Sequence, residues 1–135
     1  MTTHRLHVRA PRRGLHDITG DVGRVVARAG IDEGLCHVFI RHTSASLTIQ
    51  ENADPSARRD LETFLDRLVP ERAPWVTHTA EGDDDMPSHI KAVLTQVSLT
   101  VPVLDGDLAL GTWQGIYLWE HRDRPSSREI IVTVG

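Results

Sequence analysis

The sequence has few of the residues that would point to a secreted or membrane protein. It contains a single cysteine, Cys36, which excludes a disulfide within the chain and fits a reducing compartment. No apolar run approaches the roughly 20 residues that a membrane-spanning helix requires, and residues 1–8 lack the apolar stretch of a secretory signal. We therefore expect a cytoplasmic protein without a membrane partner.

The chain also has little positive charge. Its 15 lysine and arginine residues are outnumbered by 19 acidic residues, which gives a formal net charge of −4, and Lys91 is the only lysine. General nucleic-acid binders need a surplus of cations to displace counterions from phosphates. The composition therefore argues against a nucleic-acid partner.

The length of 135 residues fits one domain with its own core, and no repeat or linker divides it. Helical spacing of apolar residues starts at Asp21, with Thr19 as a predicted cap and Gly30 as the stop. A second helix is predicted from Asp54-Pro55, where a capping acid precedes a proline, to just before Pro70.

A third helix is predicted over residues 86–96, after a long exposed connection at 70–85. The second and third helices should each bury one apolar face, made of Ala57, Leu61, Phe64, Leu65 and Leu68 in one, and of Ile90, Val93, Leu94 and Val97 in the other. Alternating or β-branched segments predict strands at 4–8, 34–41, 47–49, 99–103, 108–111, 116–121 and 128–134. Helices mixed with strands early and strands alone later indicate a single α+β domain.

Two glycines bracket a Thr-Trp-Gln sequence inside a strand-like region, at residues 111–115. Glycine within a strand often marks a bulge or a close approach by a ligand, which would make this a shaped surface. The plainer interpretation is a strand with Trp113 in the core. The local sequence favours the plainer one, because an isolated glycine motif is a weak signal.

The sequence is rich in histidine, with eight residues, of which five are explained by surface or hydrogen-bonded positions. The other three, His42, His78 and His89, stand where a predicted rigid element meets irregular chain. Imidazoles gathered from loops and helix ends can hold zinc, with a position left open for water when the site is catalytic. Their spacing is not a compact metal motif, so the residues alone leave open whether they share a site.

Acidic side chains near these histidines have two interpretations. Glu51 is either a functional carboxylate or the end of a strand, and the run Asp83-Asp84-Asp85 is either functional or only a cap of the following helix. Lys91 follows His89 by two positions, which places it roughly 200° away around a helix. Within one subunit we therefore expect these two side chains to diverge.

Four motifs, taken together and in this order, closely resemble the YjbQ family. They are residues 42–55, 78–82, 86–91 and 110–116. The resemblance spans about residues 35–134, and its one departure is Gln50, where the family often has asparagine.

The resemblance implies an α+β protomer with antiparallel or mixed sheets and two or three helices, assembled as a homotrimer with a cleft near a subunit boundary. It makes His42, His78 and His89 the leading metal ligands, with zinc the expected ion. It also implies a secondary thiamine-phosphate synthase activity, which joins a pyrimidine pyrophosphate to a thiazole phosphate, beside a main substrate that is not settled.

Roles for other residues follow as hypotheses from this resemblance. Glu51 or Asp84 would transfer a proton, and Lys91 or Arg128 would neutralise a phosphate. A pocket for a heteroaromatic ring would be lined by Thr112, Trp113 and Gln114. Two alternatives stay open: a trimer that binds a metal and an anionic metabolite without transforming it, and a protein whose histidines and Trp113 are only structural.

Overall fold

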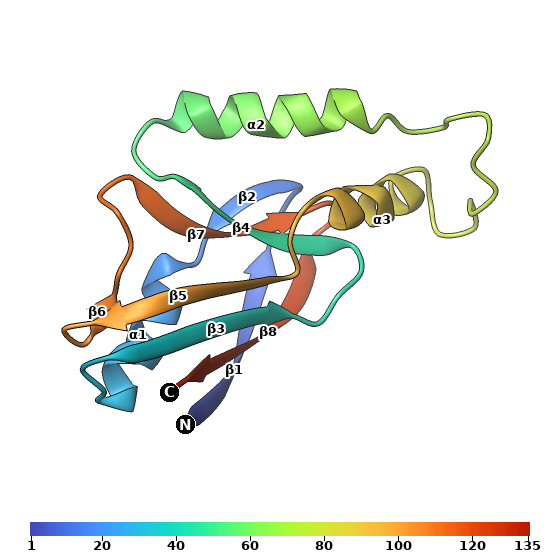
Figure 1. The fold of residues 1–135 in the computed structure, drawn as a ribbon. Coiled ribbons are helices and arrows are strands. Elements are labelled where there is room, and N and C mark those ends of the chain that lie inside the picture. Colours follow the sequence, from blue (N-terminus) through green and yellow to red (C-terminus); the bar gives the residue numbers. More distant parts are fainter.

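The strands form two antiparallel sheets, shown for residues 1–135 in a computed structural model (Figure 1). The larger sheet has the order β1-β8-β3-β5-β6 and the smaller sheet the order β2-β7-β4. The strands are β1 (Thr2–Ala10), β2 (Gly14–Asp17), β3 (Gly34–Ile40), β4 (Ala45–Glu51), β5 (Ser98–Leu104), β6 (Asp107–Leu108), β7 (Gln114–Glu120) and β8 (Ser126–Val134). The two ends of the chain lie together because Thr2 pairs with Val134.

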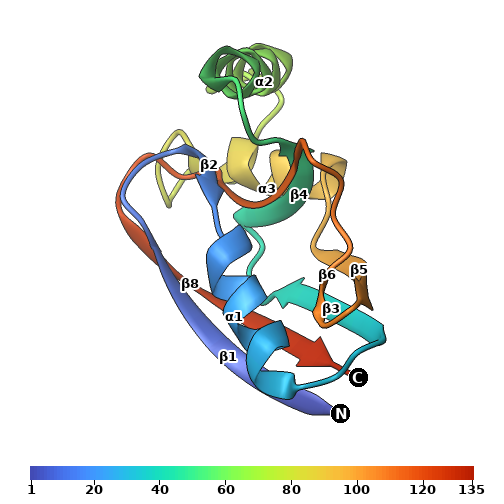
Figure 2. The same ribbon diagram turned by 90° about the vertical axis from the view of Figure 1, so that its left-hand side faces the viewer.

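Three helices complete the domain: α1 (Thr19–Ala29), α2 (Pro55–Leu68) and α3 (Asp85–Leu94). The α+β class with antiparallel sheets is therefore confirmed. Figure 2 shows α2 at the outer edge of the molecule, whereas α1 lies against the sheets. None of these helices is both long and apolar enough to cross a membrane.

Helix α1 begins and ends close to the predicted positions, for reasons that are partly local. Gly30 ends it in the left-handed conformation, with φ of 66°, as the sequence predicts. Thr19 does not cap the helix, because its hydroxyl accepts the N–H of Ile116 at 2.8 Å. This bond fastens the start of the helix to β7.

The main core lies between α1 and the two sheets. It includes Val22 and Val26 of α1, Val38 of β3 and Leu47 of β4, all of them buried. Cys36 is buried in the same core, and burial raises the pKa of its thiol to about 11. A thiol buried in this way packs in the core and is a poor nucleophile.

Helix α2 starts as predicted, with the Asp54 carboxylate accepting the N–H of Ser56 at 2.9 Å. The apolar faces of α2 and α3 depart from the prediction, because within this chain Phe64, Leu68 and Leu94 are exposed and Val93 is 83% exposed. The periodicity identified apolar faces correctly, but nothing in the chain covers these four side chains.

Candidate metal centre

Two histidines and one aspartate gather at the start of α3. Asp85 is the first residue of this helix, His89 lies one turn later on the same face, and His78 comes from the preceding connection. Asp85 is buried, and its Oδ2 lies 2.7 Å from Nε2 of His78 and 3.1 Å from Nε2 of His89. Part of each histidine side chain reaches solvent, so the group is open on one side.

The hydrogen bond on the far side of the His89 ring fixes which nitrogen is free. Nδ1 of His89 lies 2.8 Å from the carbonyl oxygen of Thr43, and a carbonyl only accepts, so Nδ1 carries the proton. In a neutral ring Nε2 then presents a lone pair to the Asp85 carboxylate. Two acceptors at 3.1 Å repel each other unless a proton or a metal ion lies between them.

The three donors are of the type that binds a metal ion, and their ligand atoms all lie within 4.8 Å of one another. The two separations from Asp85 Oδ2, of 2.7 and 3.1 Å, are close to those of ligands that share an ion. Atoms about 2.1 Å from a single ion lie roughly 3.0–3.4 Å apart in octahedral or tetrahedral arrangements. Two imidazoles and a carboxylate are a known catalytic zinc set, and the same set also suits iron(II).

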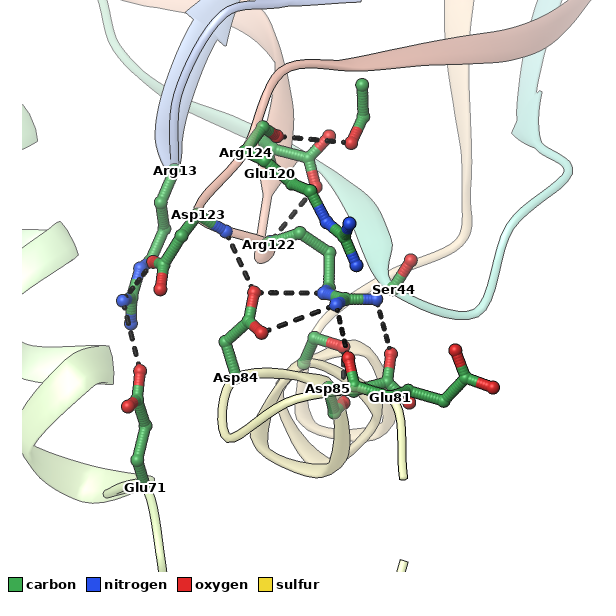
Figure 3. Close-up of polar contacts among 12 residues, drawn as sticks. Arg13, Ser44, Glu71, Glu81, Asp84, Asp85, Glu120, Arg122, Asp123 and Arg124 are labelled. Carbon is green, nitrogen blue, oxygen red and sulfur yellow. Dashed lines mark hydrogen bonds and ion pairs between the residues drawn. The ribbon is translucent and has the colours of Figure 1, made fainter. Parts of the chain in front are cut away.

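Arg122 holds the other oxygen of Asp85 (Figure 3). Its Nη1 donates to Asp85 Oδ1 at 2.7 Å, and its Nη2 donates to the carbonyl oxygen of Glu81 at 2.9 Å. Its Nε donates to Asp84 Oδ2 at 2.9 Å. The guanidinium therefore fixes the carboxylate plane of Asp85 and leaves Oδ2 for the histidines.

The groups around this network keep both carboxylates ionised. Burial alone would raise the pKa of Asp85, but hydrogen bonding from His78, the neighbouring His89 and the charge of Arg122 hold that pKa below its usual value. Burial likewise opposes ionisation of Asp84, and the bonds from Arg122 and from the Asp123 N–H lower its pKa overall. Asp84 is thus a structural anion with both oxygens engaged, and a weak proton acceptor.

His42 lies beside the group but does not belong to it within this chain. Its Nε2 accepts the N–H of Glu129 at 2.8 Å, so this nitrogen is occupied. Burial, followed by the charge of Arg128, lowers the pKa of His42 and keeps its ring neutral. Within this chain the structure thus brings together His78, Asp85 and His89, while His42 shares a pocket of about 400 Å³ with Thr43 and His89 and its role as a ligand stays a prediction.

Arg128 is buried against the same wall. Its Nη2 donates to Glu120 at 2.5 Å and to the Ser44 carbonyl oxygen at 3.2 Å, and its Nη1 lies 3.3 Å from Nδ1 of His42. Most of its donors are thus already engaged. The predicted role of Arg128 with a phosphate stays a prediction.

The structure places the remaining predicted residues away from the histidine and aspartate group. Glu51, Trp113 and Gln114 line a separate pocket of about 340 Å³, and Thr112 precedes Trp113 in the turn there. Trp113 is 64% exposed, so the interpretation that it fills the core is wrong. The Gln114 side chain accepts the N–H of Gly111 at 2.8 Å, and this bond closes the turn that presents Trp113 to solvent.

Lys91 points to the other side of α3, as the helical geometry predicts. Its Nζ donates to Asp66 of α2 at 2.5 Å, whereas His89 contacts Thr43. Sequence reasoning missed Asp85 and Arg122. An Asp-x-x-x-His pattern at 85–89, which puts both side chains on one helix face, was the signal for Asp85, and nothing local pointed to Arg122.

Comparison with known proteins identifies the family. The chain is 52% identical over 122 residues to a UPF0047 protein of Synechocystis, covering 90% of this chain and 83% of the relative. It is 45% identical over 130 residues to the UPF0047 protein YjbQ of Escherichia coli O157:H7, covering 96% and 94%.

Solved structures agree with these relatives. A protein of Thermus thermophilus, described as conserved hypothetical, matches with a TM-score of 0.87 and 37% identity, covering 98% of this chain and 99% of that one. A hypothetical protein of Aeropyrum pernix matches with a TM-score of 0.90 and 29% identity, covering 100% and 98%. Residues 4–135 match the family model described as UPF0047 protein YjbQ-like, and the chain belongs to this family.

Proposed function

We propose that this chain is a metal-dependent cytoplasmic enzyme that acts on phosphorylated small molecules, with zinc held by His78, Asp85 and His89. The observation that carries the proposal is the bond from His89 Nδ1 to the Thr43 carbonyl, which leaves Nε2 facing a carboxylate that needs a cation between them. A ring N–H donated to a backbone carbonyl is the usual support of a metal-binding histidine.

The residues around the group have separable tasks. His78, Asp85 and His89 hold the ion, and Arg122 keeps the Asp85 carboxylate in position. When bound, such an ion polarises a phosphoryl or carbonyl oxygen and stabilises charge on a leaving group. His42 lines the pocket beside His89, where it would orient a substrate, and Arg128 lies behind it, 3.3 Å from its Nδ1.

Secondary thiamine-phosphate synthase activity is the reaction that we propose to test first. Its support is the YjbQ resemblance together with the metal-type donor set, and we treat it as a side activity beside another main substrate. Glu51 is the proton-transfer candidate that keeps this role in the proposal, because Asp84 is engaged by Arg122.

We further propose that the chain acts as a homotrimer. The exposed apolar side chains of α2 and α3, including Phe64, Leu68 and Val93, support this assembly, since large apolar side chains left uncovered on two helices favour a contact with another chain. Across such a boundary, the pocket that Glu51 and Trp113 line could face the metal centre of a neighbouring subunit.

Binding without turnover is the second candidate function. It is favoured by one observation: Asp84, the carboxylate that the sequence suggested for proton transfer beside the group, is held by Arg122 and the Asp123 N–H.

The test compares wild type with His78→Ala and His89→Ala. We expect both variants to keep the wild-type circular dichroism and assembly, to lose bound zinc by elemental analysis, and to lose formation of thiamine phosphate from the two precursors. His37→Ala, on an exposed part of β3, is the matched control and should change nothing. Loss of zinc with unchanged turnover would refute a metal-dependent enzyme, and zinc binding without any product would favour the second candidate.

A further inference from the structure

A second cavity, of about 360 Å³, lies across α3 from the metal centre. Its walls come from the connection between β1 and β2, from α2, from α3 and from the end of β7, and only one of its nine lining residues is hydrophobic. Pockets for apolar ligands have the opposite composition. This cavity therefore suits a small, strongly polar ligand.

The only lysine of the chain forms part of the inner wall. Lys91 is 1% exposed, yet its ammonium group has one protein partner, Asp66, at 2.5 Å. An ammonium has three N–H donors, and a buried cation is costly unless these donors are satisfied. Two donors of Lys91 thus remain for another acceptor.

The ring of His121 supplies a second unsatisfied group in the same wall. His121 is 1% exposed, and its Nε2 lies 2.9 Å from the Ser46 hydroxyl, whereas Nδ1 has no partner at all. Burial, with the charge of Lys91 next, lowers the pKa of His121 to about 3, so the ring is neutral at physiological pH. When Ser46 donates to Nε2, Nδ1 carries the proton and becomes a free donor.

The donors that remain free decide the sign of the ligand. Asp66 accepts from both Lys91 and Arg13, and Glu62 Oε2 accepts the N–H of Leu15 at 2.7 Å. Arg13 is already engaged, because it also pairs with Glu71 and Asp123. The donors left for a ligand are those of Lys91, of His121 Nδ1 and of the Arg59 side chain in the lining.

We propose that this cavity binds a phosphate group, either as inorganic phosphate or as part of a phosphate monoester. Its several oxygens would accept from Lys91 on α3, from His121 after β7 and from Arg59 on α2. A tetrahedral anion suits donors that approach from different elements. The proposal needs no metal, so it stands or fails separately from the proposed function.

The single lysine makes a direct test possible. In protein labelled with ¹⁵N-lysine, the Lys91 ammonium gives one side-chain signal, which can be followed as inorganic phosphate is added to the full chain in the presence of a metal chelator. We expect a saturable shift of this signal, and a much weaker response to acetate at matched ionic strength. No shift up to about 10 mM phosphate, or an equal response to acetate, would overturn the proposal.

Calorimetry on charge-removing variants gives the second measurement. Lys91→Gln should weaken phosphate binding about tenfold or more, because it removes a buried charged donor. Arg67→Gln, which removes an exposed charge of α2 outside the cavity lining, is the matched control and should bind as wild type does. Equal losses in both variants would mean non-specific charge attraction and would refute the site. If Lys91→Gln does not fold, the wild-type lysine titration decides alone.

Discussion

Replacing Arg122 by lysine tests how the proposed metal centre is built. The substitution keeps the positive charge but removes the planar guanidinium that contacts Asp85, Asp84 and the Glu81 carbonyl at once. A single ammonium cannot reproduce these bonds in their geometry. We expect the Asp85 carboxylate to lose its fixed orientation toward His78 and His89.

The size of the effect follows from the position of Arg122 behind the carboxylate that we propose as a metal ligand. Loss of such a supporting bond weakens metal affinity about 10- to 100-fold, which corresponds to roughly 1.4–2.7 kcal/mol of binding free energy. The metal-free protein should also lose stability, by about 1–3 kcal/mol, because two poorly exposed carboxylates lose a charged partner.

Competition between the protein and a chromogenic zinc chelator measures the first effect, and urea unfolding of the metal-free protein measures the second. Arg124→Lys is the matched control, since Arg124 is exposed and its side chain makes no hydrogen bond or ion pair. Zinc affinity in Arg122→Lys that equals the wild-type value, in a folded protein, would refute the role that we assign to Arg122.

Two further predictions concern stability. The pKa of His121 is lowered to about 3 in the folded protein, so the unfolded state binds more protons between about pH 6.5 and pH 3. The free energy of unfolding should therefore fall with falling pH in this window, by about 1.4 kcal/mol per pH unit. Urea unfolding at several pH values should show a smaller slope in His121→Gln than in wild type. An unchanged slope would contradict a buried neutral ring. Leu47→Ala, at a side chain with 0% exposure, should lower the free energy of unfolding in urea by about 3 kcal/mol. Leu68→Ala, at an exposed position of α2, should lower it much less in the monomer. Equal losses of stability would contradict the placement of the core.

Elements set by short-range chemistry could be predicted from the sequence. The start of α2 follows from Asp54 and Pro55, and the end of α1 follows from Gly30, because each depends on neighbouring residues alone. The divergence of His89 and Lys91 follows from helix geometry in the same way.

Features that depend on distant residues could not be predicted. Strand β2 is only four residues long and exists because Leu15 pairs with Trp119, more than a hundred positions away. The predicted strand at 108–111 is shortened to Asp107–Leu108. The Gln114 side chain accepts the Gly111 N–H there and closes a turn in place of the rest of the strand. Periodicity marks an apolar face, but it does not say whether the same chain covers it.

In the candidate site, too, features set by neighbouring residues could be predicted and features set by distant residues could not. Local context singled out His78 and His89, but the third proposed ligand, Asp85, lies in an acidic run that a helix cap also explains. His42 was grouped with them by type, and the structure instead gives its Nε2 to the Glu129 N–H. Whether His42 makes this hydrogen bond depends on β8, where Glu129 lies 87 positions further along the chain.

Anomalous diffraction from crystals grown with zinc, collected on both sides of the zinc absorption edge, tests the central claim most directly. We predict one strong peak per chain, about 2 Å from Nε2 of His78, Nε2 of His89 and Oδ2 of Asp85. A peak at other residues, or none at a zinc concentration that saturates solution binding, would contradict it.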